Sequence, residues 1–390
     1  MHYIFSAVIT ACIALTIISS KKRLWAGLLL SVLAIIMIVF PSDSLMAAKD
    51  GMNLWLFVVV PSLLPFFILN DMMVALDVPK NISHFFSPIS RLLFNSSGYG
   101  AYAFIMSIFS GYPAGAKITS TLIRSGQISS EEGQRILSFS STSGPLFIIG
   151  AVGSGMLKSS SAGYLLFFSH IMGAILNGML YNIASHKTPK AKKDKISFPS
   201  FRGFDPSGML GSAISSSLIT CGYIGGYIVL FSVIIKLLNK IGFFSLPTLS
   251  GIGRSLSMLL QGCFEISSGS SIISSGVLPM EVKLILLSFI IGFGGLSILG
   301  QVSTVISGTG IRLGKYALFK LTQGILSALT CFVMLKTSLF TVPAFSSGIS
   351  PEDIFSGAKG TFILFEALLV LLLLLNLTGY AASRNHSKHI

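Results

Sequence analysis

The sequence predicts an all-α, polytopic membrane protein with two repeated halves that contain broken helices and re-entrant hairpins. Only 10% of its 390 residues are charged and 52% are hydrophobic, whereas roughly 25% of the residues in soluble domains are charged. Residues 137–152 also recur at 287–302, with eight of 16 positions identical and no gap. Glycine-interrupted apolar segments at corresponding points of two halves are typical of secondary transporters, whose site lies between the repeats.

Seven apolar segments approach the length of about 20 residues that a helix needs to cross a bilayer. They cover residues 3–19, 24–40, 54–74, 162–183, 210–238, 316–334 and 361–377. Four further apolar segments are too short or too rich in glycine to cross as simple helices. We expect half-helices or re-entrant hairpins there, at 101–109, 145–157, 256–264 and 285–299.

The order of these segments divides the chain into five parts. Leading transmembrane helices (1–50) precede the first repeat (51–184), a basic linker (185–206), the second repeat (207–338), and a C-terminal transmembrane helix and tail (339–390). The linker carries five lysines, and short basic loops of membrane proteins face the cytoplasm, so we place it there. We favour an inverted orientation of the repeats, by analogy with transporter folds.

Composition and motifs argue against several classes of function. The net charge is +14, but the basic linker lacks interleaved aromatic residues, which argues against nucleic-acid binding. Only one histidine, His170, lies inside a predicted span, and hydrolase or metalloprotease motifs are missing, so we expect no enzyme. The four cysteines lack metal or disulfide spacing, and we expect no metal and no cofactor. Whether the protein forms a homo-oligomer stays an open question.

The first candidate binding element is a break in an apolar helix. Gly111, Pro113 and Gly115 free backbone groups that are tolerated in a membrane only when buried in protein or lining a water-filled cavity. A helix restarting near Ala114 would aim its N-terminal amides at that cavity. Lys117 lies in its first turn, where a cation opposes the helix dipole, so we expect it to bind an anion or an acidic neighbour. The alternative is a lysine that snorkels to the membrane surface.

The corresponding break in the second half lies at 261–271 and contains an acid. Glu265 is followed there by Ser267 and Ser268. An acid in one half and Lys117 in the other suggest an ion pair or the two ends of one site. The alternative is that Glu265 caps a short helix.

The repeated segment supplies the remaining candidates. Its first copy carries hydroxyl side chains that run into a glycine: Ser140, Ser141, Thr142, Ser143 and Gly144. These could bind carboxylate or sugar oxygens, although hydroxyls also join helices within membranes. The second copy is apolar there and offers Phe293 as a stacking ring, with Gly294 and Gln301 completing the candidate site.

Four segments carry a family resemblance: NLWLFVVVPSLLPFFIL at 53–69, SGYPAGAK at 110–117, LSFSSTSGPLFIIGAVGSGML at 137–157 and GFGGLSILGQV at 292–302. They resemble the sporulation integral membrane protein YlbJ family, also called stage V sporulation protein V-V, over nearly the whole chain. The resemblance implies two Gate, or nucleoside-recognition, domains and a relation to concentrative nucleoside transporters. It also implies a multi-pass protein that moves dipicolinic acid, pyridine-2,6-dicarboxylate, across the outer forespore membrane during sporulation.

The expected partners are therefore the lipid bilayer and the small anion dipicolinate, which needs hydrogen-bond donors and an apolar stacking surface. Two alternatives stay open: a nucleoside carrier, and a membrane scaffold for spore assembly that transports nothing. Polar side chains beside glycine breaks in both halves favour transport over a scaffold. The resemblance and the basic charge balance favour dipicolinate over a nucleoside.

Overall fold

The computed structural model describes residues 9–15, 22–76, 78–184, 206–244 and 251–337, and the regular elements in these ranges are all helices. Within them, four helices are long and apolar enough to cross a membrane: Ser160–Ile183, Gly208–Lys240, Met280–Val305 and Leu313–Lys336. A further candidate is the pair Arg23–Val39 and Pro41–Phe57, which is bent by 103°. The predicted all-α, polytopic membrane protein is confirmed.

The part of the chain before the basic linker consists largely of short helices separated by breaks. In order they are α2 (Lys22–Val39), α3 (Pro41–Leu54), the π-helix η1 (Trp55–Val59), α4 (Val60–Ala75), α5 (Val78–Phe94), α6 (Gly98–Ser110), α7 (Ala114–Arg124), α8 (Ser130–Ile136), the π-helix η2 (Leu146–Met156) and α9 (Ser160–Ala184). The half-helices predicted at 101–109 and 145–157 correspond to α6 and η2. Ser129 caps α8 by accepting a hydrogen bond from the backbone N–H of Glu132 at 3.1 Å, the spacing of a capping box.

The part after the linker begins with the longest helix of the described chain. The elements are α10 (Pro206–Lys240), α11 (Gly251–Phe264), α12 (Ile266–Ser275), α13 (Met280–Phe293), α14 (Gly295–Val305) and α15 (Leu313–Lys336). The half-helix predicted at 256–264 lies in α11. Only Glu265 separates α11 from α12, and only Gly294 separates α13 from α14.

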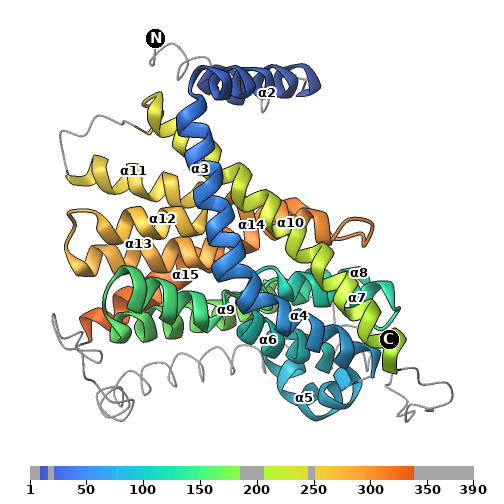
Figure 1. Cartoon of the computed structure of the whole chain (residues 1–390). Helices are drawn as coiled ribbons and strands as arrows, with labels where there is room; N and C mark the ends of the chain where they lie inside the picture. Colours follow the sequence, from blue (N-terminus) through green and yellow to red (C-terminus); the bar gives the residue numbers. More distant parts are fainter. Residues whose placement is uncertain (1–8, 16–21, 77, 185–205, 245–250, 338–390) are drawn as a thin grey trace.

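The described helices form two groups that α14 connects. Helix α10 crosses α3 and α4 and packs against both, while α9, α13 and α15 pack against one another (Figure 1). Helix α14 contacts both α10 and α15, so it joins the groups. One buried apolar cluster includes Tyr112 and Leu137 from the first half and Ile290 and Tyr316 from the second. The two halves therefore fold against each other.

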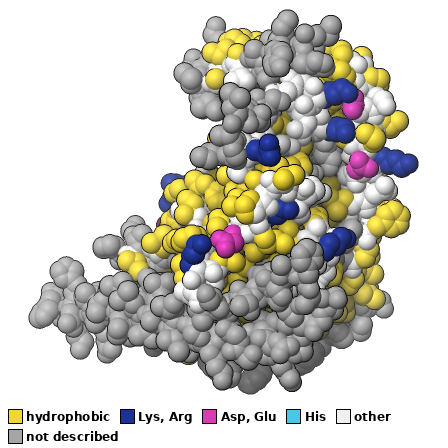
Figure 2. Space-filling view, turned by 90° about the vertical axis from the view of Figure 1, so that its left-hand side faces the viewer, with side chains coloured by type: hydrophobic (Ala, Val, Ile, Leu, Met, Phe, Trp, Pro, Cys, Tyr) yellow, Lys and Arg dark blue, Asp and Glu magenta, His cyan; other side chains and the backbone are white. Residues whose placement is uncertain are grey.

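Small residues allow the closest helix contacts. A Cβ atom added at Gly292 of α13 would lie 2.8 Å from the Cα atom of Gly324 in α15. One added at Gly173 of α9 would lie 2.8 Å from the backbone nitrogen of Ser327, also in α15. Small residues at such contacts are typical of helix packing in membranes. Figure 2 shows hydrophobic side chains over much of the described surface of one face, which fits contact with lipid.

Two predicted membrane segments differ from the structure. The predicted span at 54–74 is divided between η1 and α4, with Pro65 inside α4, and its apolar helix Leu63–Met73 is shorter than a span. A proline and a π-turn both interrupt regular helical hydrogen bonding. The segment predicted as a half-helix or hairpin at 285–299 is interrupted at Gly294, which separates the shorter helices α13 and α14, although Met280–Val305 taken together is long enough to cross. The predicted spans 3–19 and 361–377 and the basic linker fall largely outside the described residues.

Candidate functional site

A cavity of about 110 Å³, called here the central cavity, lies where helix breaks from both halves meet. Side chains of α4 and α10, among them Leu63, Phe66 and Ile228, form part of its apolar wall. Apolar walls with a few polar groups are typical of small-molecule sites. Six of the candidate residues line it: Gly111, Ser143, Gly144, Glu265, Ser267 and Gln301.

The first break has the predicted position and contacts a second break. Helix α6 ends at Ser110, Gly111 has a φ of +75°, and α7 begins at Ala114. The positive φ favours glycine. A Cβ atom at Gly111 would lie 2.7 Å from the backbone nitrogen of Gly144, so the two glycines bring the breaks together. Pro113 and Gly115 belong to the same break but do not line the central cavity.

The run of hydroxyl side chains is used mainly to join helices. Ser141 Oγ lies 2.7 Å from the Tyr316 hydroxyl, and Thr142 Oγ1 lies 2.9 Å from Ser107 Oγ. Ser140 is buried, and its hydroxyl has no hydrogen-bond partner among the described residues. Of this run only Ser143 reaches the central cavity. The helix-joining alternative therefore describes Ser141 and Thr142.

His170 holds the cavity end of this run in place. Its Nε2 accepts a hydrogen bond from the backbone N–H of Ser143 at 2.8 Å. The nitrogen that accepts must be unprotonated, so the ring is neutral in this arrangement. The histidine that sequence analysis left without a role thus positions Ser143 and the adjoining Gly144.

Glu265 caps α12. Its side chain is buried, and its two carboxylate oxygens accept hydrogen bonds from the backbone N–H groups of Ser267 at 2.9 Å and Ser268 at 2.7 Å. The alternative weighed from the sequence, a helix cap, is therefore correct. Because both oxygens already have partners, Glu265 brings a satisfied negative charge to the cavity wall.

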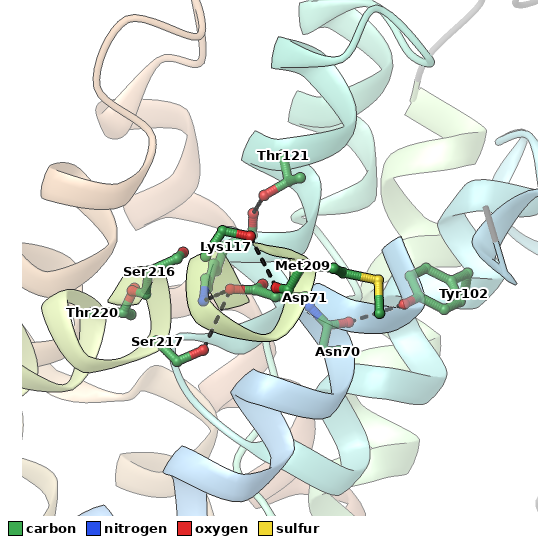
Figure 3. A network of polar contacts seen from close by, with 10 residues as sticks. Asn70, Asp71, Tyr102, Lys117, Thr121, Met209, Ser216, Ser217 and Thr220 are labelled. Carbon is green, nitrogen blue, oxygen red and sulfur yellow. Dashed lines mark hydrogen bonds and ion pairs between the residues drawn. The ribbon is translucent and has the colours of Figure 1, made fainter. Parts of the chain in front are cut away.

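Lys117 forms its ion pair with a residue that sequence analysis did not single out. Its Nζ lies 2.7 Å from Asp71 Oδ2 of α4, and Ser217 of α10 donates to the same oxygen at 3.3 Å (Figure 3). The two side chains are only 8% and 14% exposed, so Lys117 does not snorkel to the surface. The predicted pair with Glu265 is not formed in the described part of the chain. Lys117 also does not line the central cavity.

Of the candidates from the second copy of the repeat, some line the central cavity and others do not. The Phe293 ring stacks on Phe289, with centroids 6.1 Å apart, and neither Phe293 nor Gly294 lines the cavity. Ser268 contributes only its backbone N–H to the α12 cap. Gln301 does line the cavity; it is 3% exposed, and its Oε1 has no partner among the described residues. An uncommitted buried amide oxygen on a cavity wall indicates a ligand or water position.

Three polar residues around these breaks were not among the candidates predicted from the sequence. Asp71 and Lys320 lie inside predicted spans, where an ionisable side chain is by default a functional candidate, and that rule could have found both. Tyr112 lines the central cavity, and its hydroxyl accepts a hydrogen bond from Lys320. An aromatic residue between a glycine and a proline gave no sequence signal of this contact.

The stabilisation that Glu265 gives by capping α12 can be tested separately from the effect of its negative charge. Glu265→Ala is expected to destabilise the protein by about 1 kcal/mol or more, because α12 loses its cap. Glu265→Asn restores a side-chain acceptor without a charge and should recover most of this loss. Thermal unfolding of both variants in one detergent measures the difference. Equal destabilisation by Ala and Asn would mean that the charge, and not the cap, stabilises this end of α12.

Comparison with known proteins identifies the family. The chain matches no family model and no solved structure. It is 36% identical over 324 residues to the sporulation integral membrane protein YlbJ of Bacillus subtilis (strain 168), and the match covers 76% of this chain and 78% of that protein. Identity at this level over most of both chains shows common descent. The chain belongs to the family of the sporulation integral membrane protein YlbJ.

Proposed function

We propose that this protein is a secondary transporter that carries dipicolinate across the outer forespore membrane during sporulation, and that it is not an enzyme. Its family and its apolar helices support a membrane role in sporulation. The observation that carries the transport proposal is the central cavity, which breaks from both halves line. Irregular backbone at membrane depth is tolerated where it is buried in protein or lines such a cavity, as in transporters built from discontinuous helices.

The chemistry of the cavity fits a flat, anionic ring. Leu63, Phe66 and Ile228 offer an apolar surface to the ring. The first residues of η2, beginning after Pro145, lie at the wall, and the free N–H groups of a helix N-terminus attract carboxylates. Gln301 adds an amide that could bind a second polar group.

We also propose that the two halves are inverted Gate-type repeats. Each half brings two breaks together: Gly111 meets Gly144 in the first, while in the second a Cβ atom at Gly295 would lie 3.3 Å from the Phe264 carbonyl oxygen. Contacts between corresponding breaks in the two halves support a duplication. The repeat boundaries stay those predicted from the sequence.

A strain that lacks this protein is expected to form spores but to accumulate dipicolinate outside the forespore. The reason is that a dianion does not cross a lipid bilayer unaided, since burying an unpaired charge in hydrocarbon is very costly. Dipicolinate measured in purified spores should fall strongly and should recover when the wild-type gene is restored. A normal dipicolinate content in the deletion strain would contradict the proposed substrate.

Direct binding separates the alternatives. The purified protein, titrated calorimetrically, is expected to bind dipicolinate and not uridine. The opposite preference would favour a nucleoside carrier. Binding of neither ligand, together with a spore-assembly defect in the deletion strain, would favour a scaffold.

A further inference from the structure

Lys320 of α15 is a second buried lysine, and it lies directly behind the wall of the central cavity. It is 0% exposed. Its Nζ donates hydrogen bonds to the Tyr112 hydroxyl at 2.6 Å, the Ser141 carbonyl at 2.8 Å and Gln323 Oε1 at 2.6 Å. The same Nζ lies 4.5 Å from the centroid of the Tyr112 ring.

The hydrogen bonds around Lys320 fit the charged form of its side chain. The Tyr112 hydroxyl donates its proton to the carbonyl oxygen of Ile291 at 2.9 Å, so toward Lys320 it can only accept. The Ser141 carbonyl and Gln323 Oε1 are also acceptors. Three acceptors match the three N–H donors of an ammonium group, which has no lone pair. The surroundings are therefore built for a cation.

This cation has no acidic partner within ion-pair distance in the described part of the chain. Lys117, the other buried lysine, is neutralised by Asp71. The carboxylate of Glu265 is held by the amides of α12. A buried charge that meets only neutral acceptors is costly unless a counter-charge comes near. The central cavity lies next to this cation across Tyr112, so an anion bound there can act as such a counter-charge.

Tyr112 connects the two positions, because it lines the central cavity and also contacts Lys320. The wall between them is buried protein, in which charges act over longer distances than in water. We propose that Lys320 selects anionic ligands in the central cavity by its positive charge, acting through the Tyr112 wall without touching the ligand. This inference rests on the proposed function, and it makes Lys320 a specificity-determining residue.

The test compares ligands of one shape and different charge. Pyridine-2,6-dicarboxylate, pyridine-2-carboxylate and the neutral pyridine-2-carboxamide are titrated into wild-type protein and Lys320→Met. For each carboxylate group that a ligand carries, the variant should lose about tenfold of the preference over the neutral carboxamide. This is the effect of a unit charge roughly 10 Å away in a protein interior. A purely structural role would weaken all three ligands by the same factor, and this result would overturn the proposal.

A second variant neutralises the charge without removing the lysine. Gln323→Glu places a carboxylate where the amide oxygen now lies 2.6 Å from Nζ. It should reduce the charge preference as Lys320→Met does, while thermal stability is kept or raised. This variant tests the proposal even if Lys320→Met does not fold. An unchanged preference in Gln323→Glu would contradict it.

The control and a second ligand pair separate the two proposals. Lys336→Met makes the same substitution in the same helix, where the lysine is 57% exposed, and should leave the preference unchanged. If wild-type protein binds none of the pyridines, the proposed function fails. The charge proposal is then tested with uracil and its carboxylate, orotate. Wild-type protein that does not favour orotate over uracil would overturn it as well.

Discussion

Asp71→Leu is expected to destabilise the protein severely, because it leaves Lys117 buried without a counter-charge. Breaking a buried ion pair from one side costs about 3 to 5 kcal/mol, while replacing both partners by apolar residues is often close to neutral. Ser217 would also lose its acceptor. The double variant Asp71→Leu with Lys117→Met should therefore recover most of the lost stability. Thermal unfolding in detergent, with monodispersity as a second readout, measures the four proteins of this cycle.

The matched control is Asp43→Leu, which removes the acid of a more exposed pair. Lys240 and Asp43 are 44% and 22% exposed in that pair, and such pairs contribute about 0 to 1 kcal/mol. If Asp71→Leu unfolds no earlier than Asp43→Leu, the buried pair does not stabilise α4 against α7. Because Lys117 lies outside the cavity wall, Lys117→Met should change stability more than it changes ligand affinity.

The helix breaks could be predicted because glycine and proline act locally. Gly111 and Pro113 interrupt an apolar pattern, and α7 begins at Ala114 as expected. The long apolar segments that became α9, α10 and α15 were equally clear, since length and hydropathy are properties of a single segment. Gly294 was harder. A glycine between two helices can turn the chain back or let it continue, and only packing against neighbouring helices decides.

The partners of the polar side chains could not be predicted, because they come from distant segments. Asp71 is 46 residues from Lys117, and the Ser141 hydroxyl meets Tyr316 from 175 residues away. A hydroxyl beside a break can face a cavity or a neighbouring helix with the same local sequence. Asp71 and Lys320 themselves could have been found by chain-local reasoning, since an ionisable side chain inside an apolar span needs a reason to be there.

Gly115→Ala is expected to be the most disruptive single-methyl change in this region. A Cβ atom at Gly115 would lie 1.6 Å from the carbonyl oxygen of Ser140 and 3.1 Å from Ser107 Cβ. The obstacle is backbone, so either α7 or the segment around Ser140 must move. Overpacking of this kind costs about 1 to 3 kcal/mol and occasionally more, and we expect the upper part of that range or beyond. The movement also displaces Ser143 and Gly144, so ligand affinity should fall with stability.

The control is Gly226→Ala in α10, where a Cβ atom would meet nothing within 4 Å. Alanine is favoured over glycine in a helix interior by about 1 kcal/mol, so this variant should unfold at the same temperature as wild type or slightly higher. The two substitutions add the same methyl group to helical glycines, and only the neighbouring backbone differs. Equal melting temperatures for Gly115→Ala and Gly226→Ala would mean that α7 does not pack directly against the Ser140 carbonyl. The close contact between Gly115 and the Ser140 carbonyl, which fixes the position of the cavity wall, would then be contradicted.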